Sequence, residues 1–200
     1  MRLYSTLVLF LTISFLSAQA FSYEEGLKNC DTARVELNKQ IEASGKWMGL
    51  RAECLTGASL PDFTVTTMDG KTIDRNYFLG KVTVINFWMK TCKPCISEIP
   101  GLSKLKDEFA TENVNFLAIG RTSEEETIAF LNLYPWNWDQ VKNGQPLIEE
   151  VWKFGWGYPV TMLVNKKGEI ILSFNGGVIG DNGQIVHDRL KPLIQQELLK

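Results

Sequence analysis

The chain has little histidine, little cysteine and almost no net charge. Its 200 residues include one histidine and four cysteines, and the formal charge at pH 7 is −2. A structural zinc site takes four Cys or His ligands, so this composition disfavours one. The charge also lacks the basic excess that marks nucleic-acid binding, so no nucleic-acid partner and no metal are expected.

What the chain does have is enough apolar material for one folded domain. Hydrophobic residues make up 44% of the sequence. A chain of this length buries a sizeable core within a single domain, and a second full domain is not expected.

The first 20 residues have the pattern of a secretory signal peptide. Arg2 supplies the positive charge, residues 7–16 form an apolar core, and residues 18–20 read Ala-Gln-Ala, a small-residue cleavage site. The apolar core is short for a membrane span. We expect export, most simply to the periplasm, with a mature chain that begins at Phe21. An uncleaved membrane anchor is the alternative.

A strand, a pair of cysteines and a helix follow one another in the middle of the chain. The apolar, β-branched run at residues 82–88 predicts a buried strand, and Cys92-Lys93-Pro94-Cys95 follows it closely. Apolar residues then recur at helical spacing, at Ile96, Ile99, Leu102, Leu105 and Phe109. The pair of cysteines is therefore expected at the start of a helix.

This position suits redox chemistry at the two cysteines. The N-terminus of a helix offers unpaired N–H groups and partial positive charge, which stabilise a thiolate at Cys92. Pro94 fits the first helical turn and Lys93 adds a positive charge. Cys95 is close enough to attack a mixed disulfide formed at Cys92 and to release the partner. A purely structural disulfide is the simpler alternative.

Residues 86–100 read Asn-Phe-Trp-x-x-x-Cys-x-x-Cys-x-x-Glu-x-Pro. This pattern resembles the thioredoxin superfamily, and within it the TlpA/ResA-like extracytoplasmic thiol-disulfide oxidoreductases. Pro100 matches the helix proline of that family, and Gly157-Tyr158-Pro159-Val160 matches its cis-proline loop. Residues 160–173 read as the family's last two strands. The resemblance covers about residues 60–200.

The resemblance implies an α/β, thioredoxin-like fold, with a central mixed β-sheet flanked by helices and preceded by a hairpin. It implies exchange of disulfides with protein partners, in the direction of reduction, often in cytochrome c maturation, and with a membrane electron donor. No cofactor is expected beyond the redox-active disulfide. The residues expected to contact a substrate are Trp88, Lys93, Pro94, Tyr158 and Pro159. The oligomeric state is left open.

A proton acceptor for the second cysteine is harder to place. The resemblance aligns Asn86 with a buried acid that transfers protons in thioredoxin, and an amide cannot do so. Glu98 lies three residues after Cys95, about one helical turn away, and is the nearest candidate. The alternative is that Glu98 is a solvated charge on the helix.

Three other functions remain open. A peroxidase is suggested by Thr91, although peroxiredoxins use the spacing Thr-x-x-Cys and Thr91 is adjacent to Cys92. A copper chaperone on the same fold would use two cysteines and a histidine, here His187. A non-catalytic binding module would use the tryptophan-rich residues 133–156, most of which are expected in the core.

The remaining cysteines lie in an N-terminal extension at residues 21–59. Disulfides persist outside the cytoplasm, so Cys30 and Cys54 are expected to pair and to staple the extension onto the domain at residues 60–200. Residues 33–41 between them are predicted to be helical. The resemblance does not supply this pair, and a second redox pair that relays electrons to the first is the competing interpretation.

Overall fold

The computed structural model describes residues 20–45, 52–153 and 156–200. The predicted signal peptide lies outside them except for residue 20, so the expectations of export and cleavage remain predictions. Within the described ranges, no helix combines the length and the apolar character needed to cross a bilayer.

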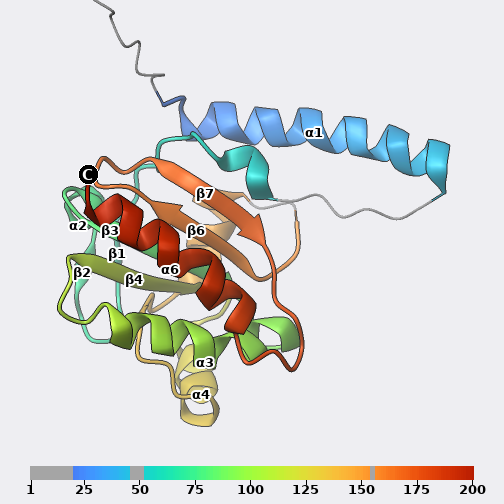
Figure 1. Cartoon of the computed structure of the whole chain (residues 1–200). Coiled ribbons are helices and arrows are strands. Elements are labelled where there is room, and N and C mark those ends of the chain that lie inside the picture. Colours follow the sequence, from blue (N-terminus) through green and yellow to red (C-terminus); the bar gives the residue numbers. More distant parts are fainter. Residues whose placement is uncertain (1–19, 46–51, 154–155) are drawn as a thin grey trace, which may run out of the picture.

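A five-stranded mixed β-sheet forms the centre of the fold (Figure 1). Its order is β5-β4-β3-β6-β7, with β3 and β4 parallel and β3 and β6 antiparallel. The strands are β3 (Val82–Trp88), β4 (Val114–Gly120), β5 (Asp139–Gln140), β6 (Val160–Val164) and β7 (Ile170–Asn175). The expectation of a thioredoxin-like fold with a mixed sheet between helices is confirmed.

Strand β3 lies in the middle of the sheet, and all seven of its residues are buried. Its bounds are those that the apolar run predicts. Successive side chains of a strand point to opposite faces. Ile85 and Phe87 join one hydrophobic cluster, whereas Val84 and Trp88 join the other. The sheet therefore separates two cores.

The two cores are covered by different helices. On one face lie α3 (Lys93–Glu108), α4 (Glu124–Leu133) and α6 (Gln184–Leu198). The other face is covered by α1 (Tyr23–Ser44), η1 (Ala52–Leu55), α2 (Arg75–Phe78), α5 (Gly144–Leu147) and η2 (Ile148–Trp152). A short hairpin of β1 (Val65–Thr66) and β2 (Thr72–Ile73) precedes α2. Pro100 lies inside α3 and does not end it.

The N-terminal extension is a long helix that is only partly packed. Ser22 caps α1, and its hydroxyl accepts a hydrogen bond from the Glu25 N–H. The helix therefore begins ten residues before the predicted segment. Tyr23, Gly26 and Cys30 are buried, while the C-terminal part of α1 runs past the sheet (Figure 1). A disulfide joins Cys30 to Cys54 in η1.

The tryptophans of the aromatic region are mostly core residues, as expected. Trp136, Trp138 and Trp152 are buried, and Trp156 is half-buried. Trp136 packs beside Trp138, and the indole N–H of Trp138 donates to the Leu102 carbonyl over 3.0 Å. Trp136 and Trp138 therefore fill the core between the sheet and α3, whereas Trp152 fills the core on the opposite face of the sheet.

Helix α3 and the loop after β7 touch through their backbones. A Cβ atom added at Gly101 would lie 2.1 Å from the carbonyl oxygen of Gly183, and one added at Gly183 would lie 2.4 Å from the Glu98 carbonyl oxygen. Neither position has room for a methyl group. Two glycines thus set the separation between α3 and the start of α6.

We predict that Gly101→Ala destabilises the chain by about 2 kcal/mol, because overpacking against backbone outweighs the helix propensity of alanine. Urea unfolding of the oxidised chain measures this change. Lys104→Ala on the same helix, whose lysine is exposed, is the control and should change stability by less than about 0.5 kcal/mol. A Gly101→Ala variant as stable as the parent would show that the two backbones separate easily.

Candidate active site

Cys92 and Cys95 form a disulfide at the N-terminus of α3. Cys92 is the N-cap residue of the helix, and its sulfur accepts a hydrogen bond from the Cys95 N–H over 3.2 Å. A backbone donor thus already points at Cys92 Sγ, together with the positive end of the helix dipole. The N-terminus of a helix stabilises negative charge on a sulfur, and the backbone donor here is aimed at Cys92 Sγ.

Both sulfurs are nearly covered. Cys92 is 6% exposed and Cys95 is 2% exposed, so the first is the more accessible to a partner. Lys93 between them is exposed and Pro94 is half-buried. Of the two cysteines, Cys92 is therefore both the more exposed and the one that accepts a backbone hydrogen bond.

The loop before β6 lies beside the dithiol. The Tyr158–Pro159 peptide is cis, as the resemblance implies. Val160 pairs with Phe87, which places Pro159 at the end of the sheet where β3 leads into the cysteine motif. A Cβ atom at Gly177 would lie 2.8 Å from Pro94 and 3.1 Å from Pro159, so both prolines touch this one glycine. Pro159 and the cysteine motif are thus neighbours.

Glu98, which follows Cys95 by three residues in α3, is buried and is not a solvated charge. Its side chain is 1% exposed. The Asn86 side-chain amide donates to Glu98 Oε2 over 3.4 Å and to the Thr161 hydroxyl over 3.0 Å. Burial raises the pKa of Glu98 to about 8, the Asn86 hydrogen bond opposes this, and the charge of Asp181 adds to it. The carboxyl group therefore keeps its proton at neutral pH and titrates in the range of thiols.

Trp88 does not reach the surface that a substrate would meet. It has no exposed area, and its ring stacks on Phe130 with 4.2 Å between ring centroids. The expectation that Trp88 contacts a substrate is corrected accordingly, because packing against α4 holds the indole behind the dithiol. Tyr158 is half-buried, and burial raises the pKa of its hydroxyl.

His187 lies far from the cysteines. Its Nε2 lies 3.1 Å from a carboxylate oxygen of Glu108, and its Nδ1 lies 2.9 Å from a carboxylate oxygen of Asp188. Glu108 is at the opposite end of α3 from Cys95, about 20 Å away at the rise of an α-helix. The structure therefore does not bring His187 together with the two cysteines, as the copper-chaperone hypothesis requires.

The loop after β7 contributes residues that the sequence patterns miss. The Ser97 hydroxyl donates to the Val178 carbonyl over 3.0 Å and accepts from the Gly180 N–H over 2.9 Å. Asn175, the last residue of β7, donates to the Gly157 carbonyl over 2.7 Å. The pair Gly176-Gly177 after a strand is the one sequence signal of this close approach.

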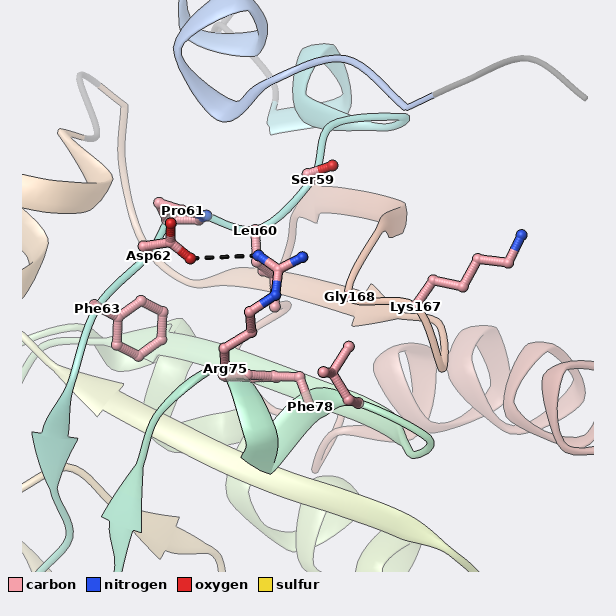
Figure 2. Close-up of a pocket in the computed structure, with 10 residues that line it drawn as sticks. Ser59, Leu60, Pro61, Asp62, Phe63, Arg75, Phe78, Lys167 and Gly168 are labelled. Carbon is pink, nitrogen blue, oxygen red and sulfur yellow. Dashed lines mark hydrogen bonds and ion pairs between the residues drawn. The ribbon is translucent and has the colours of Figure 1, made fainter.

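A separate pocket lies at the other end of the sheet (Figure 2). It is lined by the segment around Pro61, by Arg75 and Phe78, and by the turn at Gly168, and an ion pair of 3.4 Å joins Asp62 to Arg75. The Gly80 N–H, just before β3, bonds to the Lys166 carbonyl in that same turn. The pocket is thus near the start of β3, whereas the cysteines follow its end.

Comparison with known proteins agrees with this geometry. The sequence model of the AhpC/TSA family matches residues 56–177. The chain is 31% identical over 120 residues to the thiol-disulfide oxidoreductase ResA of Bacillus thuringiensis, an alignment that covers 58% of this chain and 66% of that protein, just under two thirds. It is 26% identical over 147 residues to ResA of Halalkalibacterium halodurans, which covers 71% of this chain and 81% of the relative.

Among solved structures, a thiol:disulfide interchange protein of the thioredoxin family from Chlorobium tepidum superposes with a TM-score of 0.56 at 19% identity. The superposition covers 70% of this chain and 95% of the other. This likeness shows the fold. Since the family model spans more than half of the sequence, and includes both Cys92 and Cys95, the chain belongs to the AhpC/TSA family, in its thioredoxin-like, ResA-related part.

Proposed function

We propose that the chain is an exported thiol-disulfide oxidoreductase that reduces disulfides of protein partners through Cys92 and Cys95. The observation that carries the proposal is the Cys92–Cys95 disulfide itself, placed at the N-cap of α3 beside Pro159. A structural disulfide needs no helix dipole, no cis-proline neighbour and no buried acid, and this one has all three. The ResA relatives carry the name of the same activity.

The first step uses Cys92 of the reduced chain. Its thiolate, stabilised by the Cys95 N–H, attacks one sulfur of the partner's disulfide. A bond forms between Cys92 and that sulfur, the partner's S–S bond breaks, and the partner's other sulfur leaves as a thiolate that takes a proton from solvent. The product is a mixed disulfide.

The second step uses Cys95 and Glu98. In chains whose Glu98 has released its proton to solvent, a fraction that grows as the pH approaches 8, the Cys95 thiol passes its proton to the Glu98 carboxylate and attacks Cys92 Sγ. The Cys92–Cys95 bond forms, the bond between Cys92 and the partner's sulfur breaks, and the partner's second thiolate is released. Two electrons have moved from the chain to the partner. The raised pKa of Glu98, about 8, is close to that of a thiol. Transfer of the proton from the Cys95 thiol to Glu98 therefore changes the free energy little.

The substrate surface is the half-exposed rim around Cys92. Lys93, Pro94 and Tyr158 lie there, and Pro159 forms its floor. We expect the backbone at Tyr158 to pair with an extended peptide segment in the manner of an added strand. Thr91 is also exposed, and it offers nothing that favours a peroxidase over dithiol exchange.

Export and the direction of electron flow are parts of the same proposal. The leader pattern at residues 1–20 supports export, and the Cys30–Cys54 disulfide is of a kind that persists outside the cytoplasm. The TlpA/ResA-like resemblance supports reduction of partners, with a membrane donor that reduces Cys92–Cys95 again and with cytochrome c maturation as the setting.

Replacement of each cysteine by serine separates the attacking role of Cys92 from the resolving role of Cys95. Cys92→Ser should lower insulin reduction by more than about a thousandfold, because the nucleophile is lost. Cys95→Ser should instead accumulate a mixed disulfide between Cys92 and the substrate, visible by mass spectrometry without reductant. If Cys92→Ser retained the reduction of partner disulfides, the proposed function would be wrong. Partner binding without any turnover by the parent would favour the binding module.

Glu98→Gln should slow the reaction roughly a hundredfold and remove the ionisation near pH 8 from its pH profile. It should also change stability. Folded Glu98 keeps its proton up to about pH 8, whereas the unfolded group releases it near pH 4.5. The parent therefore loses stability as the pH rises between these values, and the variant does not. Urea unfolding at several pH values measures this difference.

The control for Glu98→Gln is Glu125→Gln, which removes an exposed carboxylate on α4. It should leave both the rate and the pH dependence of stability unchanged. A Glu98→Gln variant with the parent's pH profile would exclude Glu98 as the proton acceptor.

The reduction potential of the Cys92–Cys95 pair decides the direction. We expect a value below about −220 mV, in the range of dithiols that reduce their partners. Equilibration of a Cys30→Ser/Cys54→Ser chain in defined thiol buffers measures it without interference from the second disulfide. A value above about −180 mV would make the chain an oxidase or an isomerase.

A further inference from the structure

The N-terminal extension is linked by hydrogen bonds to the loop that carries the cis-proline. The backbone N–H of Ala52, in η1, donates to Oδ1 of Asn175 over 2.7 Å. The Nδ2 of the same side chain donates to the Gly157 carbonyl over 2.7 Å and to the Pro159 carbonyl over 3.4 Å. One amide therefore joins η1 to the loop beside the dithiol.

Asn175 is suited to this bridge by its chemistry and its place. An amide side chain offers an acceptor and two donors at once, which neither a carboxylate nor a hydroxyl of this length does with fixed geometry. Asn175 ends β7 and pairs in register with Val160, the residue after the cis-proline. Its side chain is half-buried, which limits competition from water.

A second contact joins the extension to the segment before the loop. The Tyr23 hydroxyl, on the first turn of α1, donates to the Trp152 carbonyl over 2.9 Å. The two rings also pack edge to face, with 5.3 Å between their centroids. The extension thus contacts η2 at Trp152, and the loop itself through Asn175.

The Cys30–Cys54 disulfide holds these two contacts together. Tyr23 and Cys30 lie on one face of α1, and Ala52 and Cys54 lie in the single turn of η1. The disulfide fixes η1 against α1. The Gly57 N–H then bonds to the Ile170 carbonyl over 2.7 Å, which attaches the same unit to the start of β7.

The arrangement does not suit electron relay. Cys30 belongs to the core on the α1 face of the sheet, whereas Cys92 and Cys95 belong to the core on the α3 face. The sheet lies between the two disulfides. The contact between the extension and the cis-proline loop is instead the hydrogen-bond bridge at Asn175, at the end of the sheet.

We propose that Asn175 is a positioning residue through which the disulfide-stapled extension holds the Gly157–Pro159 loop in the shape that binds a protein substrate. This inference rests on the proposed function, because it assumes that the loop receives the substrate's backbone. Substrates that need no backbone pairing do not depend on the bridge. Protein disulfides and small disulfides should therefore respond differently when the bridge is broken.

The experiment compares two substrates in single turnover. Full-length chain is reduced at Cys92 and Cys95, with retention of Cys30–Cys54 verified by mass spectrometry, and is mixed with oxidised insulin or with 5,5′-dithiobis(2-nitrobenzoate). We expect Asn175→Ala to raise the half-saturating insulin concentration roughly tenfold, since two hydrogen bonds to the loop are lost. Its rate with the small disulfide should stay within about twofold of the parent.

Asn175→Asp divides the bridge into its two halves. The carboxylate still accepts from the Ala52 N–H, so the extension stays attached, but it has no donor for the Gly157 and Pro159 carbonyls. It should show the same loss with insulin at a melting temperature close to that of the parent. It therefore tests the inference even if Asn175→Ala unfolds.

The matched control is Asn165→Ala in the β6–β7 turn. Asn165 is also a half-buried asparagine, its side chain makes three hydrogen bonds, and it lies at the far end of the same hairpin. It should leave the half-saturating insulin concentration unchanged. A rise equal to that of Asn175→Ala would assign the effect to general loosening of the hairpin and would overturn the inference.

Removal of the Cys30–Cys54 disulfide completes the test. Cys30→Ser/Cys54→Ser should raise the half-saturating insulin concentration in the same way, and its combination with Asn175→Ala should add little, because both changes cut one linkage. Fully additive effects, or parent-like insulin constants for both Asn175 variants, would overturn the inference and leave the proposed function intact. Loss of activity by Cys92→Ser tests that function separately.

Discussion

The N-cap position of Cys92 is the constraint on which the rest of the site depends. The buried strand β3 ends at Trp88, a short connection follows, and α3 begins at Lys93 with Cys92 as its N-cap. The Cys92 sulfur occupies the N-cap position that a serine or aspartate oxygen usually fills. The free Cys95 N–H of the first turn therefore donates its hydrogen bond to this sulfur. Shifting the start of α3 by one residue would aim this donor elsewhere.

Burial of the Glu98 carboxyl group lowers the stability of the fold at pH values where the group would be ionised in the unfolded chain. Glu98 is held out of water by the loop after β7, which touches α3 through Gly101 and Gly183 and through both hydrogen bonds of Ser97. Burial without a cationic partner destabilises the charged form, and this raises the pKa of the carboxyl group. The same packing that lowers stability as the pH rises from about 4.5 to about 8 brings the pKa of Glu98 close to that of a thiol, as the proposed proton transfer requires.

Local patterns in the sequence predicted much of this arrangement, and they failed where partners are distant. The β-branched run predicted β3 to the residue, and helical spacing placed Glu98 one turn from Cys95. Spacing could not show that Glu98 is buried, since the residues that cover it come from the loop after β7. It also placed Trp88 near the dithiol without showing that α4 covers it.

Asn175 was missed for the same physical reason. Its hydrogen-bond partner Ala52 lies 123 positions away in the chain, and no periodicity or motif records such a pair. The length of α1 was underestimated because Ser22, not the apolar stripe, decides where the helix begins.

In a chain that carries both a thiolate nucleophile and a second disulfide, the nucleophile could attack and reduce that second disulfide. Here the nucleophile and the staple are in separate cores on opposite faces of the sheet, and Cys30 is 1% exposed. The sheet keeps Cys92 away from Cys30–Cys54 in its own chain, and a thiol of a second copy would find Cys30 covered and Cys54 half-buried. The sheet thereby separates the nucleophile of the proposed reaction from the disulfide that holds the N-terminal extension.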